Sequence, residues 1–530
     1  MFGGRLFLQI IFGSDHSGYQ ERSGNQNGDS FQNDMEANFF ALFLGKWPGE
    51  RPLIQTVNHA IKFFVRIDAV PPLIHWRLKV GDRLEFQKKK ILVVAPNNWS
   101  AQELSRYSNR YEYIFVEDQF QKEGISFLHW LRLIWGLDFQ KGVAKLAHLA
   151  KKHGADGIIG ADDFISCVYA SAAARSLGLP GAVTELELTF QHKYYSRILQ
   201  KKFVPEMVPG FQLLDFKQPP KFPFFAKPVR GSASIMAKRI YSDEELIQYR
   251  EMPFLKWFTY KRLIALFQGV AEQVAKISPV SAMAVAEDII EGQQCTLEGF
   301  VYHGKNHIIG VTDSEMYPNS KLSFARFNFP SVLPRKAQQK MSEAAETLIM
   351  CSGFSFGFYN IEFFYNPKTG DVKIIEINPR MAFQFTDLYE KVLGINTFDL
   401  LLKMTIGDDI SKELVKPGKV GRYKKATSFV LRSFTDAKVI SVPSEEQVQA
   451  VCRDIQDSRV LIQAKPGTIL SDDIFQDVES FRLATINLGG NSEEELISKY
   501  KAALSTLPFV LEPKPAMIPM LQEDIQSEAV

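Results

Sequence analysis

The sequence predicts a protein of the α/β class, with a parallel β-sheet in its N-terminal part and further strands after it. Two observations support this prediction. Short apolar segments alternate with segments of helical periodicity over residues 88–190, which indicates the parallel sheet, and a strand–turn–strand pattern at residues 359–380 indicates a β-hairpin. Strands that alternate with helices of this length are typical of parallel βαβ units. With 530 residues, the chain is long enough for roughly two to four domains.

The first predicted elements follow from local patterns. Lys88–Pro96 (KKKILVVAP) is a short apolar segment preceded by charges, which is typical of a buried strand. A helical pattern runs from Asp162 to Leu177 and is ended by Gly178 and Pro180. Between them we predict a strand at Tyr113–Glu117, helices at Phe127–Trp135 and Val143–His153, and a strand at Gly157–Gly160.

Composition excludes several classes of protein. A hydrophobic content of 45% and a charged content of 23% are ordinary for a soluble globular protein, and a net charge of +2 argues against a nucleic-acid partner. No apolar run is long enough to span a membrane. The four cysteines include no CxxC pair, which indicates reduced thiols, so we expect a cytoplasmic protein. Residues 1–34 are predicted to form a disordered tail and residues 35–87 an N-terminal extension.

A predicted β-hairpin at Tyr359–Arg380 (YNIEFFYNPKTGDVKIIEINPR) is the most informative stretch. Its two strands are joined by a turn-forming cluster at Asn366–Gly370. Side chains alternate along a strand, so polar groups share a face: Asn360 and Glu362 in the first strand, and Glu376, Asn378 and Arg380 in the second. Carboxylates on an apolar sheet need a cation, and oxygen ligands of this kind suit Mg²⁺. A solvated edge hairpin with alternating charges explains the same residues equally well.

Phe222–Met236 (FPFFAKPVRGSASIM) is a candidate phosphate-binding segment. A strand ending at Lys227-Pro228 leads into a Gly/Ser loop, Arg230–Ser234, whose backbone N–H groups could converge on phosphate oxygens. Lys227 would add a positive charge. The segment is neither a P-loop nor a GxGxxG fingerprint, and an ordinary hairpin is the alternative.

Ala284–Glu298 (AVAEDIIEGQQCTLE) reads as a strand, a kink at Glu291-Gly292 and a second strand. The backbone of such a linker could bind the edge of an adenine ring, with Glu287 and Asp288 as exposed side chains beside it. A plain strand–turn–strand is the alternative.

The order of these motifs resembles that of the ATP-grasp superfamily over roughly residues 88–500. The matching motifs, in chain order, are His192-Lys193, Lys227-Pro with RGSAS, Glu287-Asp-Ile-Ile-Glu-Gly, Asn360-Ile-Glu362 and Ile375-Glu-Ile-Asn-Pro-Arg380. The resemblance implies an ATP-binding part of α+β character. It divides the chain into a parallel-sheet pre-ATP-grasp domain (88–190), an ATP-grasp domain (191–406, with a lid at about 222–290), a C-terminal α+β subdomain (407–512) and a tail (513–530).

The C-terminal segment is similar to the subdomain found in biotin carboxylases and L-amino-acid ligases. Here we predict strands at Ala426–Ser433, Lys438–Val442 and Val460–Gln463. A helix at Ser492–Leu504 would begin with a capping box of Ser492 and Glu495.

The resemblance also implies roles for individual residues. Lys193 and Lys227 would contact the ATP phosphates, and Arg230, Gly231, Ser232 and Ser234 would belong to a glycine-rich lid. Glu287, Asp288, Ile289 and Ile290 would contact adenine, and Gln294 would contact the ribose, where many relatives have a glutamate. Glu362, Glu376 and Asn378 would hold Mg²⁺ or Mn²⁺, and Arg380 would act with Lys227 in catalysis. Glu298 is a candidate for a substrate amine or a metal and Arg326 for a substrate carboxylate, with surface positions as the alternatives.

The resemblance implies an ATP-dependent carboxylate–amine or carboxylate–thiol ligase that forms an acylphosphate from amino acids or similar small carboxylates. A homodimer is among the expected assemblies. Two other functions stay open: a bicarbonate-activating, carboxylase-like enzyme, and a nucleotide-binding protein without catalytic activity.

Overall fold

The computed structural model describes residues 88–116, 138–160, 162–231, 236–251, 254–318, 320, 322–411, 421–472 and 480–514. All of them belong to one compact unit, Asp82–Val530. Several predictions concern residues outside this described part: the tail and extension at 1–87, the helix at Phe127–Trp135, the loop residues Ser232 and Ser234, and most of the tail at 513–530.

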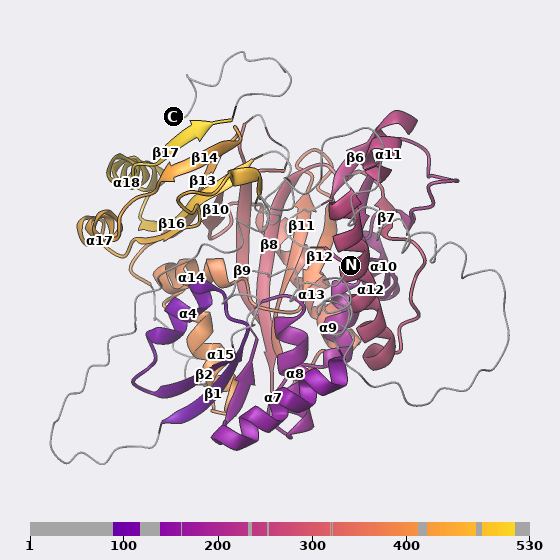
Figure 1. Cartoon of the computed structure of the whole chain (residues 1–530), viewed down its shortest axis with the longest axis horizontal. Helices are drawn as coiled ribbons and strands as arrows, with labels where there is room; N and C mark the ends of the chain where they lie inside the picture. Colours follow the sequence, from indigo (N-terminus) through magenta and orange to yellow (C-terminus); the bar gives the residue numbers. More distant parts are fainter. Residues whose placement is uncertain are drawn as a thin grey trace, which may run out of the picture. The chain divides into compact units, whose positions relative to one another are not determined.

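A small parallel sheet opens the described chain (Figure 1). Its strands are β1 (Lys89–Val94), β2 (Tyr111–Val116) and β3 (Gly157–Ile159), in the order β2-β1-β3. The helices are α4 (Asn98–Ser105), α7 (Phe139–His153) and α8 (Ser166–Ser176). The predicted parallel sheet is therefore confirmed. The predicted start of the last helix is wrong, because residues 162–165 form a turn before α8 begins.

The next elements build a four-stranded antiparallel sheet in the order β4-β7-β5-β6. Its strands are β4 (Phe211–Leu213), β5 (Phe224–Pro228), β6 (Lys238–Ile240) and β7 (Ala284–Glu287). Helices α10 (Lys193–Phe203), α11 (Asp243–Arg250) and α12 (Phe254–Ala275) lie around it, with a short turn η1 at Pro205–Met207. Helix α9 (Thr184–Gln191) precedes α10 and contacts α12 and β12.

An eight-stranded antiparallel sheet forms the centre of the molecule, in the order β12-β11-β8-β9-β10-β13-β16-β15. Its strands are β8 (Gln293–Tyr302), β9 (Lys305–Met316), β10 (Phe324–Phe329), β11 (Gly357–Tyr365), β12 (Val372–Asn378), β13 (Lys425–Ser433), β15 (Arg459–Ile462) and β16 (Phe481–Gly490). Helix α13 (Arg335–Ser352) packs on one face, and η2 (Phe383–Phe385) and α14 (Thr386–Leu393) pack on the other, followed by α15 (Thr397–Thr405).

The predicted hairpin is confirmed as β11 and β12. Its turn is held locally, since the Asn366 side chain accepts a hydrogen bond from the Lys368 N–H at 2.9 Å and Gly370 takes a positive φ of 73°. Ile361, Phe363 and Ile374 are fully buried on the α13 face. The opposite face of the hairpin is therefore the one that carries its polar side chains.

The C-terminal segment continues the same sheet, because β13 pairs with β10 and β16 pairs with β13. A separate two-stranded sheet joins β14 (Ala437–Ser441) to β17 (Val510–Pro513). The remaining elements are α17 (Glu445–Asp454), η3 (Leu470–Asp472) and α18 (Glu493–Thr506). The three predicted strands are confirmed to within a residue or so.

The predicted capping box at the start of α18 is only half formed. Ser492 accepts from the Glu495 N–H at 3.2 Å, but the Glu495 carboxylate accepts from the N–H of Asn491. A complete capping box stands instead at the start of α17, between Ser444 and Gln447.

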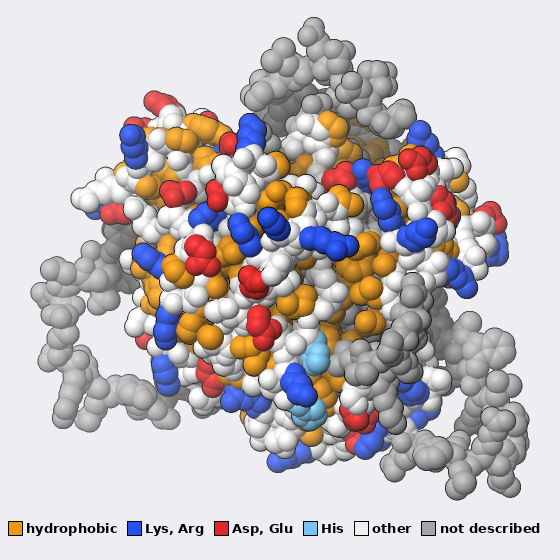
Figure 2. All heavy atoms as spheres, turned by 180° about the vertical axis from the view of Figure 1, so that it is seen from behind, with side chains coloured by type: hydrophobic (Ala, Val, Ile, Leu, Met, Phe, Trp, Pro, Cys, Tyr) orange, Lys and Arg blue, Asp and Glu red, His pale blue; other side chains and the backbone are white. Residues whose placement is uncertain are grey.

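Within the described residues, no helix has the length and apolar character needed to cross a bilayer. On the face drawn in Figure 2, acidic and basic side chains are interspersed rather than gathered by sign. The four cysteines all lie in the described part and all are free thiols.

Candidate active site

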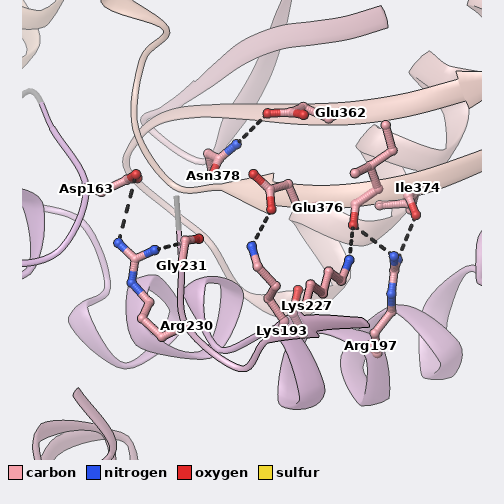
Figure 3. Close-up of polar contacts among 12 residues, drawn as sticks. Asp163, Lys193, Arg197, Lys227, Arg230, Gly231, Glu362, Ile374, Glu376 and Asn378 are labelled. Atoms are coloured by element: carbon pink, nitrogen blue, oxygen red, sulfur yellow. Dashed lines mark hydrogen bonds and ion pairs between the residues drawn. The ribbon is translucent and has the colours of Figure 1, made fainter. Parts of the chain in front are cut away.

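The polar face of the hairpin brings two carboxylates and two amides together. Strand register pairs Asn360 with Asn378 and Glu362 with Glu376, so all four side chains point to the same side of the sheet. The Asn378 amide donates to the Asn360 oxygen at 3.0 Å and to a Glu362 oxygen at 3.3 Å (Figure 3). The predicted set of Glu362, Glu376 and Asn378 is therefore assembled on one face.

The two carboxylates have different electrostatic surroundings. Burial and the neighbouring charge of Glu376 raise the pKa of Glu362 to about 7. Although burial opposes it, Lys193 lowers the pKa of Glu376, which it contacts directly. Gln294 donates to the other oxygen of Glu362 at 2.9 Å. The hairpin thus holds a carboxylate pair that an added cation would stabilise in its doubly ionised form.

This donor set fits Mg²⁺. Two carboxylates and an amide oxygen are hard ligands, and Mg²⁺ is usually held by one or two carboxylates together with phosphate and water. In the described part of the chain, no group of three or more His, Cys, Asp and Glu side chains forms a complete metal cage. A metal held here would complete its coordination with ligands from outside the chain, such as water or phosphate oxygens.

A cluster of buried cations faces the hairpin from α10 and β5. Lys227 is 5% exposed, and its Nζ lies 2.9 Å from a Glu287 oxygen and 3.1 Å from the Ile375 carbonyl. Arg197 donates to both Glu287 oxygens, at 2.8 and 3.0 Å, and also to the carbonyls of Ile374 and Ile375 (Figure 3). Burial lowers the pKa of Lys227 to about 8, while Glu287 acts in the opposite direction.

The expectation that Glu287 is an exposed side chain beside adenine is wrong. Glu287 is 4% exposed, and its carboxylate is fully engaged with Arg197 and Lys227. Although burial opposes it, these two cations lower the pKa of Glu287 to about 2. Glu287 therefore fixes the cations of the site rather than lining a nucleotide pocket with its side chain.

The predicted kinked linker between β7 and β8 is confirmed. Asp288 is exposed as expected and accepts from the Gly210 N–H at 2.9 Å, while Ile289 and Ile290 are half-buried. Gly292 has a φ of 144°, and a Cβ added there would lie 2.3 Å from the Tyr365 carbonyl oxygen. A larger residue at position 292 would therefore clash with the turn of the hairpin, so the end of the linker requires a glycine.

Arg380 lies just beyond the end of β12 and contacts the carboxylate of Asp163, which lies in the loop after β3. Its Nε donates to Asp163 Oδ1 at 2.7 Å and its Nη2 to Asp163 Oδ2 at 3.3 Å. Arg230, where the predicted Gly/Ser loop begins, lies 3.9 Å from the same carboxylate (Figure 3). Nη1 of Arg230 donates to the Gly231 carbonyl at 3.1 Å.

The two predicted substrate residues have different outcomes. Glu298 is not a surface residue: it is fully buried, shares the polar face with Asn360, and accepts from the Ala382 N–H at 3.0 Å and the Tyr389 hydroxyl at 3.2 Å. Burial raises the pKa of Glu298 to about 8.

Arg326 is not brought to the site. It bonds Glu315 at 2.8 Å and pairs with Glu493 at the start of α18, on the opposite face of the sheet from Glu298. Its guanidinium already has two protein carboxylates, so a substrate carboxylate would have to compete with both.

Arg197 and Asp163 are not among the site residues predicted from the sequence. Arg197 follows Lys193 by one helical turn on α10, a spacing that places both on one helix face. Asp163 follows β3, and the carboxyl ends of parallel strands are where α/β sheets place ligands. Both signals are present in the sequence.

Part of the chain matches a known domain family. Residues 220–386, which contain the cation strand, the linker and the hairpin, match the family model described as the ATP-grasp domain. The chain carries an ATP-grasp domain. Over 260 residues the chain is 23% identical to the carbamoyl phosphate synthase large chain, C-terminal section, of Methanopyrus kandleri, covering 47% of this chain and 43% of that protein. The carbamoyl phosphate synthase large chain of Buchnera aphidicola is 21% identical over 211 residues, covering 36% of this chain and 19% of that protein. The chain therefore spans less than half the length of these curated relatives.

Solved structures resemble a larger share of this chain. An L-amino acid ligase from Bacillus licheniformis has a TM-score of 0.58 at 15% identity, covering 80% of this chain and 98% of that one. A biotin carboxylase from Campylobacter jejuni, solved as a β,γ-ATP complex, has a TM-score of 0.55 at 15% identity, covering 81% and 93%. A phosphoribosylglycinamide synthetase from Anaerococcus prevotii has a TM-score of 0.53 at 13% identity, covering 80% and 100%. At these identities the likeness establishes the fold, and the predicted α/β ATP-grasp fold is confirmed.

Proposed function

We propose that this protein is an ATP- and Mg²⁺-dependent, ADP-forming ligase that joins a small carboxylate, such as that of an amino acid, to an amine. The convergence of Lys193, Lys227 and the two-carboxylate hairpin on one side of the central sheet is the observation that supports this most directly. Phosphoryl transfer needs little covalent help from the protein and depends on positioning and charge neutralisation. The cluster supplies both.

In this proposal each group of the chain has one task. Glu362, Glu376 and Asn378 would hold Mg²⁺, which neutralises phosphate charge when it is bound. Lys193 and Lys227 would bind phosphate oxygens. Lys193 contacts the Glu376 carboxylate and Lys227 contacts the Ile375 carbonyl, so both amines lie beside the proposed metal ligands of the hairpin.

The substrate carboxylate would attack the γ-phosphorus of ATP, forming a P–O bond while the bond to ADP breaks. The amine nitrogen would then attack the acyl carbon, forming a C–N bond, releasing phosphate and losing a proton. Arg380 would place its positive charge beside the oxygen atoms on which negative charge develops in both steps.

A second candidate, activation of bicarbonate instead of an organic carboxylate, is supported by the similarity to carbamoyl phosphate synthases. The ATP chemistry at the hairpin would be the same. The homodimer and the cytoplasmic location stay predictions.

Release of ADP and phosphate by the purified full-length chain tests these functions. We expect turnover with ATP, Mg²⁺ and pairs of amino acids. The product, in which the two amino acids are joined, should be detectable by mass spectrometry. Turnover with bicarbonate alone would favour the second candidate. A folded protein that turns over no ATP with a broad panel would contradict both and favour a nucleotide-binding protein without activity.

The Glu376→Gln variant tests the role of the hairpin carboxylates in turnover. It keeps the shape of the side chain but removes one of the two carboxylates, so we expect turnover to fall at least about 100-fold. Glu343→Gln is the control, because Glu343 is exposed on α13, which covers the opposite face of the sheet. Equal effects of the two substitutions would contradict the assignment of the site.

A further inference from the structure

We propose that Asp163, in the loop between β3 and α8, is a positioning residue for the reaction, because it sets the orientation of the Arg380 guanidinium at the end of the hairpin. The inference rests on the proposed function and adds to it a residue from outside the ATP-grasp family match at 220–386. It means that the site is complete only when the first sheet is docked on the central one.

The contact is a two-point carboxylate–guanidinium pair. The Asp163 oxygens accept from Nε at 2.7 Å and Nη2 at 3.3 Å, and Nη1 donates to the Met381 carbonyl at 3.2 Å. These bonds fix the plane of the guanidinium group. They leave N–H groups on Nη1 and Nη2 without a partner among the described residues, so the outer edge of Arg380 is available for an anion.

The loop that carries Asp163 is itself held in place. Asp162 accepts from the Asn97 amide at 3.2 Å and from the Asp163 N–H at 2.9 Å. The Gln191 side chain accepts from the Phe164 N–H at 2.9 Å. Contacts on both sides of Asp163 therefore restrain its backbone, which is what a positioning residue requires.

The backbone on which Arg380 sits is restrained as well. Asn360 donates to the Arg380 carbonyl at 3.1 Å, and Glu298 accepts from the Ala382 N–H at 3.0 Å. Residues of β11 and β8 therefore restrain the backbone around Arg380. The side chain of Arg380 could still rotate, and the bonds to Asp163 restrain that rotation. Side-chain exposures of 18% for Arg380 and 13% for Asp163 leave the pair reachable but shielded from bulk water.

Arg230 gives Asp163 a second cation at 3.9 Å. Arg230 also lies over the Phe267 ring, 5.7 Å from its centroid. The Asp163 carboxylate thus lies near both Arg230 and Arg380. Its negative charge partly offsets the repulsion between these two guanidinium groups.

The test compares Asp163→Asn, Asp163→Glu and Asp156→Asn in the full-length chain. Asp163→Asn should lower kcat roughly 100-fold, because misplacing a reacting group by about 1 Å has effects of that size. The KM for ATP should change less than about threefold, and Asp163→Glu should recover part of kcat because it restores the charge. Asp156→Asn should leave kcat unchanged, because Asp156 lies at the other end of β3 and pairs with the exposed Lys89.

A second readout needs no turnover. In urea unfolding, the midpoint shift of an Asp163→Asn/Arg380→Met double variant should be smaller than the sum of the two single shifts, because the variants remove the same contact. Additive shifts would overturn the contact itself.

The kinetic outcomes separate the two proposals. Wild-type turnover with an unchanged kcat in Asp163→Asn would overturn the assignment of Asp163 alone. A lower carboxylate KM with full kcat would also overturn it, since Asp163 would then compete with substrate for Arg380 rather than position it. Absence of wild-type turnover would overturn the proposed function and, with it, any catalytic meaning of the contact.

Discussion

Replacing Glu287 with glutamine removes the charge that two buried cations share. In the structure the carboxylate bonds Arg197 at 2.8 and 3.0 Å and Lys227 at 2.9 Å, and the side chains of all three residues are at most 6% exposed. A glutamine of the same shape can accept only at one oxygen, and it presents an N–H group to one of the cations.

The expected cost follows from that burial. Breaking a buried ion pair by removing one partner costs about 3–5 kcal/mol, because the remaining charge is left uncompensated. With a urea m-value of about 3 kcal/mol/M, the unfolding midpoint should fall by roughly 1–1.7 M. Lys227 limits the loss, since its pKa of about 8 would drop further without Glu287 and the amine could become neutral.

The assay is urea unfolding at pH 7 and pH 9, followed by circular dichroism. We expect a smaller loss at pH 9, where Lys227 is mostly neutral in either protein. Glu185→Gln is the control, because Glu185 pairs with Arg175 at the surface, with both side chains more than 40% exposed, and should cost under about 1 kcal/mol. If Glu287→Gln shifted the midpoint no more than Glu185→Gln does, the buried cluster would not contribute as argued.

Three further predictions concern pH and metal. ATP affinity should fall as the pH rises through about 8, because Lys227 loses its proton there, and Lys227→Met should bind ATP weakly but without this pH dependence. Glu298 is protonated in the folded state up to a pKa of about 8, against 4.5 unfolded, so its contribution to stability should be full below pH 4.5 and lost between pH 4.5 and 8. The slope is about 1.4 kcal/mol per pH unit, and Glu298→Gln should flatten that part of the stability profile. Gln294→Leu removes the donor at 2.9 Å from Glu362, so half-maximal turnover should need several-fold more Mg²⁺, while an unchanged Mg²⁺ dependence would contradict the contact.

The hairpin could be predicted from the sequence because its signals are local. Alternating side chains and an asparagine–glycine turn fix both strands within 22 residues, Tyr359–Arg380, and register then brings Glu362 opposite Glu376. The parallel sheet was predictable for the same reason, since each apolar strand and each helix is a continuous segment.

Contacts between distant segments could not be predicted in this way. Glu287 looked exposed because its two cations lie on α10 and β5, and Arg197 is 90 residues away in the sequence. Arg326 looked available because nothing local shows that Glu493, 167 residues later, meets it. Asp163 was assigned to a helix, since a helical pattern does not reveal that the preceding turn faces another sheet.

The continuity of the eight-stranded sheet has a mechanical consequence. The hairpin strands β11 and β12 and the C-terminal strands β13 and β16 belong to one hydrogen-bonded ladder, so they cannot shift against each other without breaking it. The four-stranded sheet is hydrogen-bonded separately and follows its own course up to the linker at Asp288–Gly292. The chain enters the four-stranded sheet from η1 at Phe211 and leaves it through Asp288–Gly292. Any movement between the two sheets would have to be taken up at these two crossings, while the hairpin and the C-terminal strands would move together.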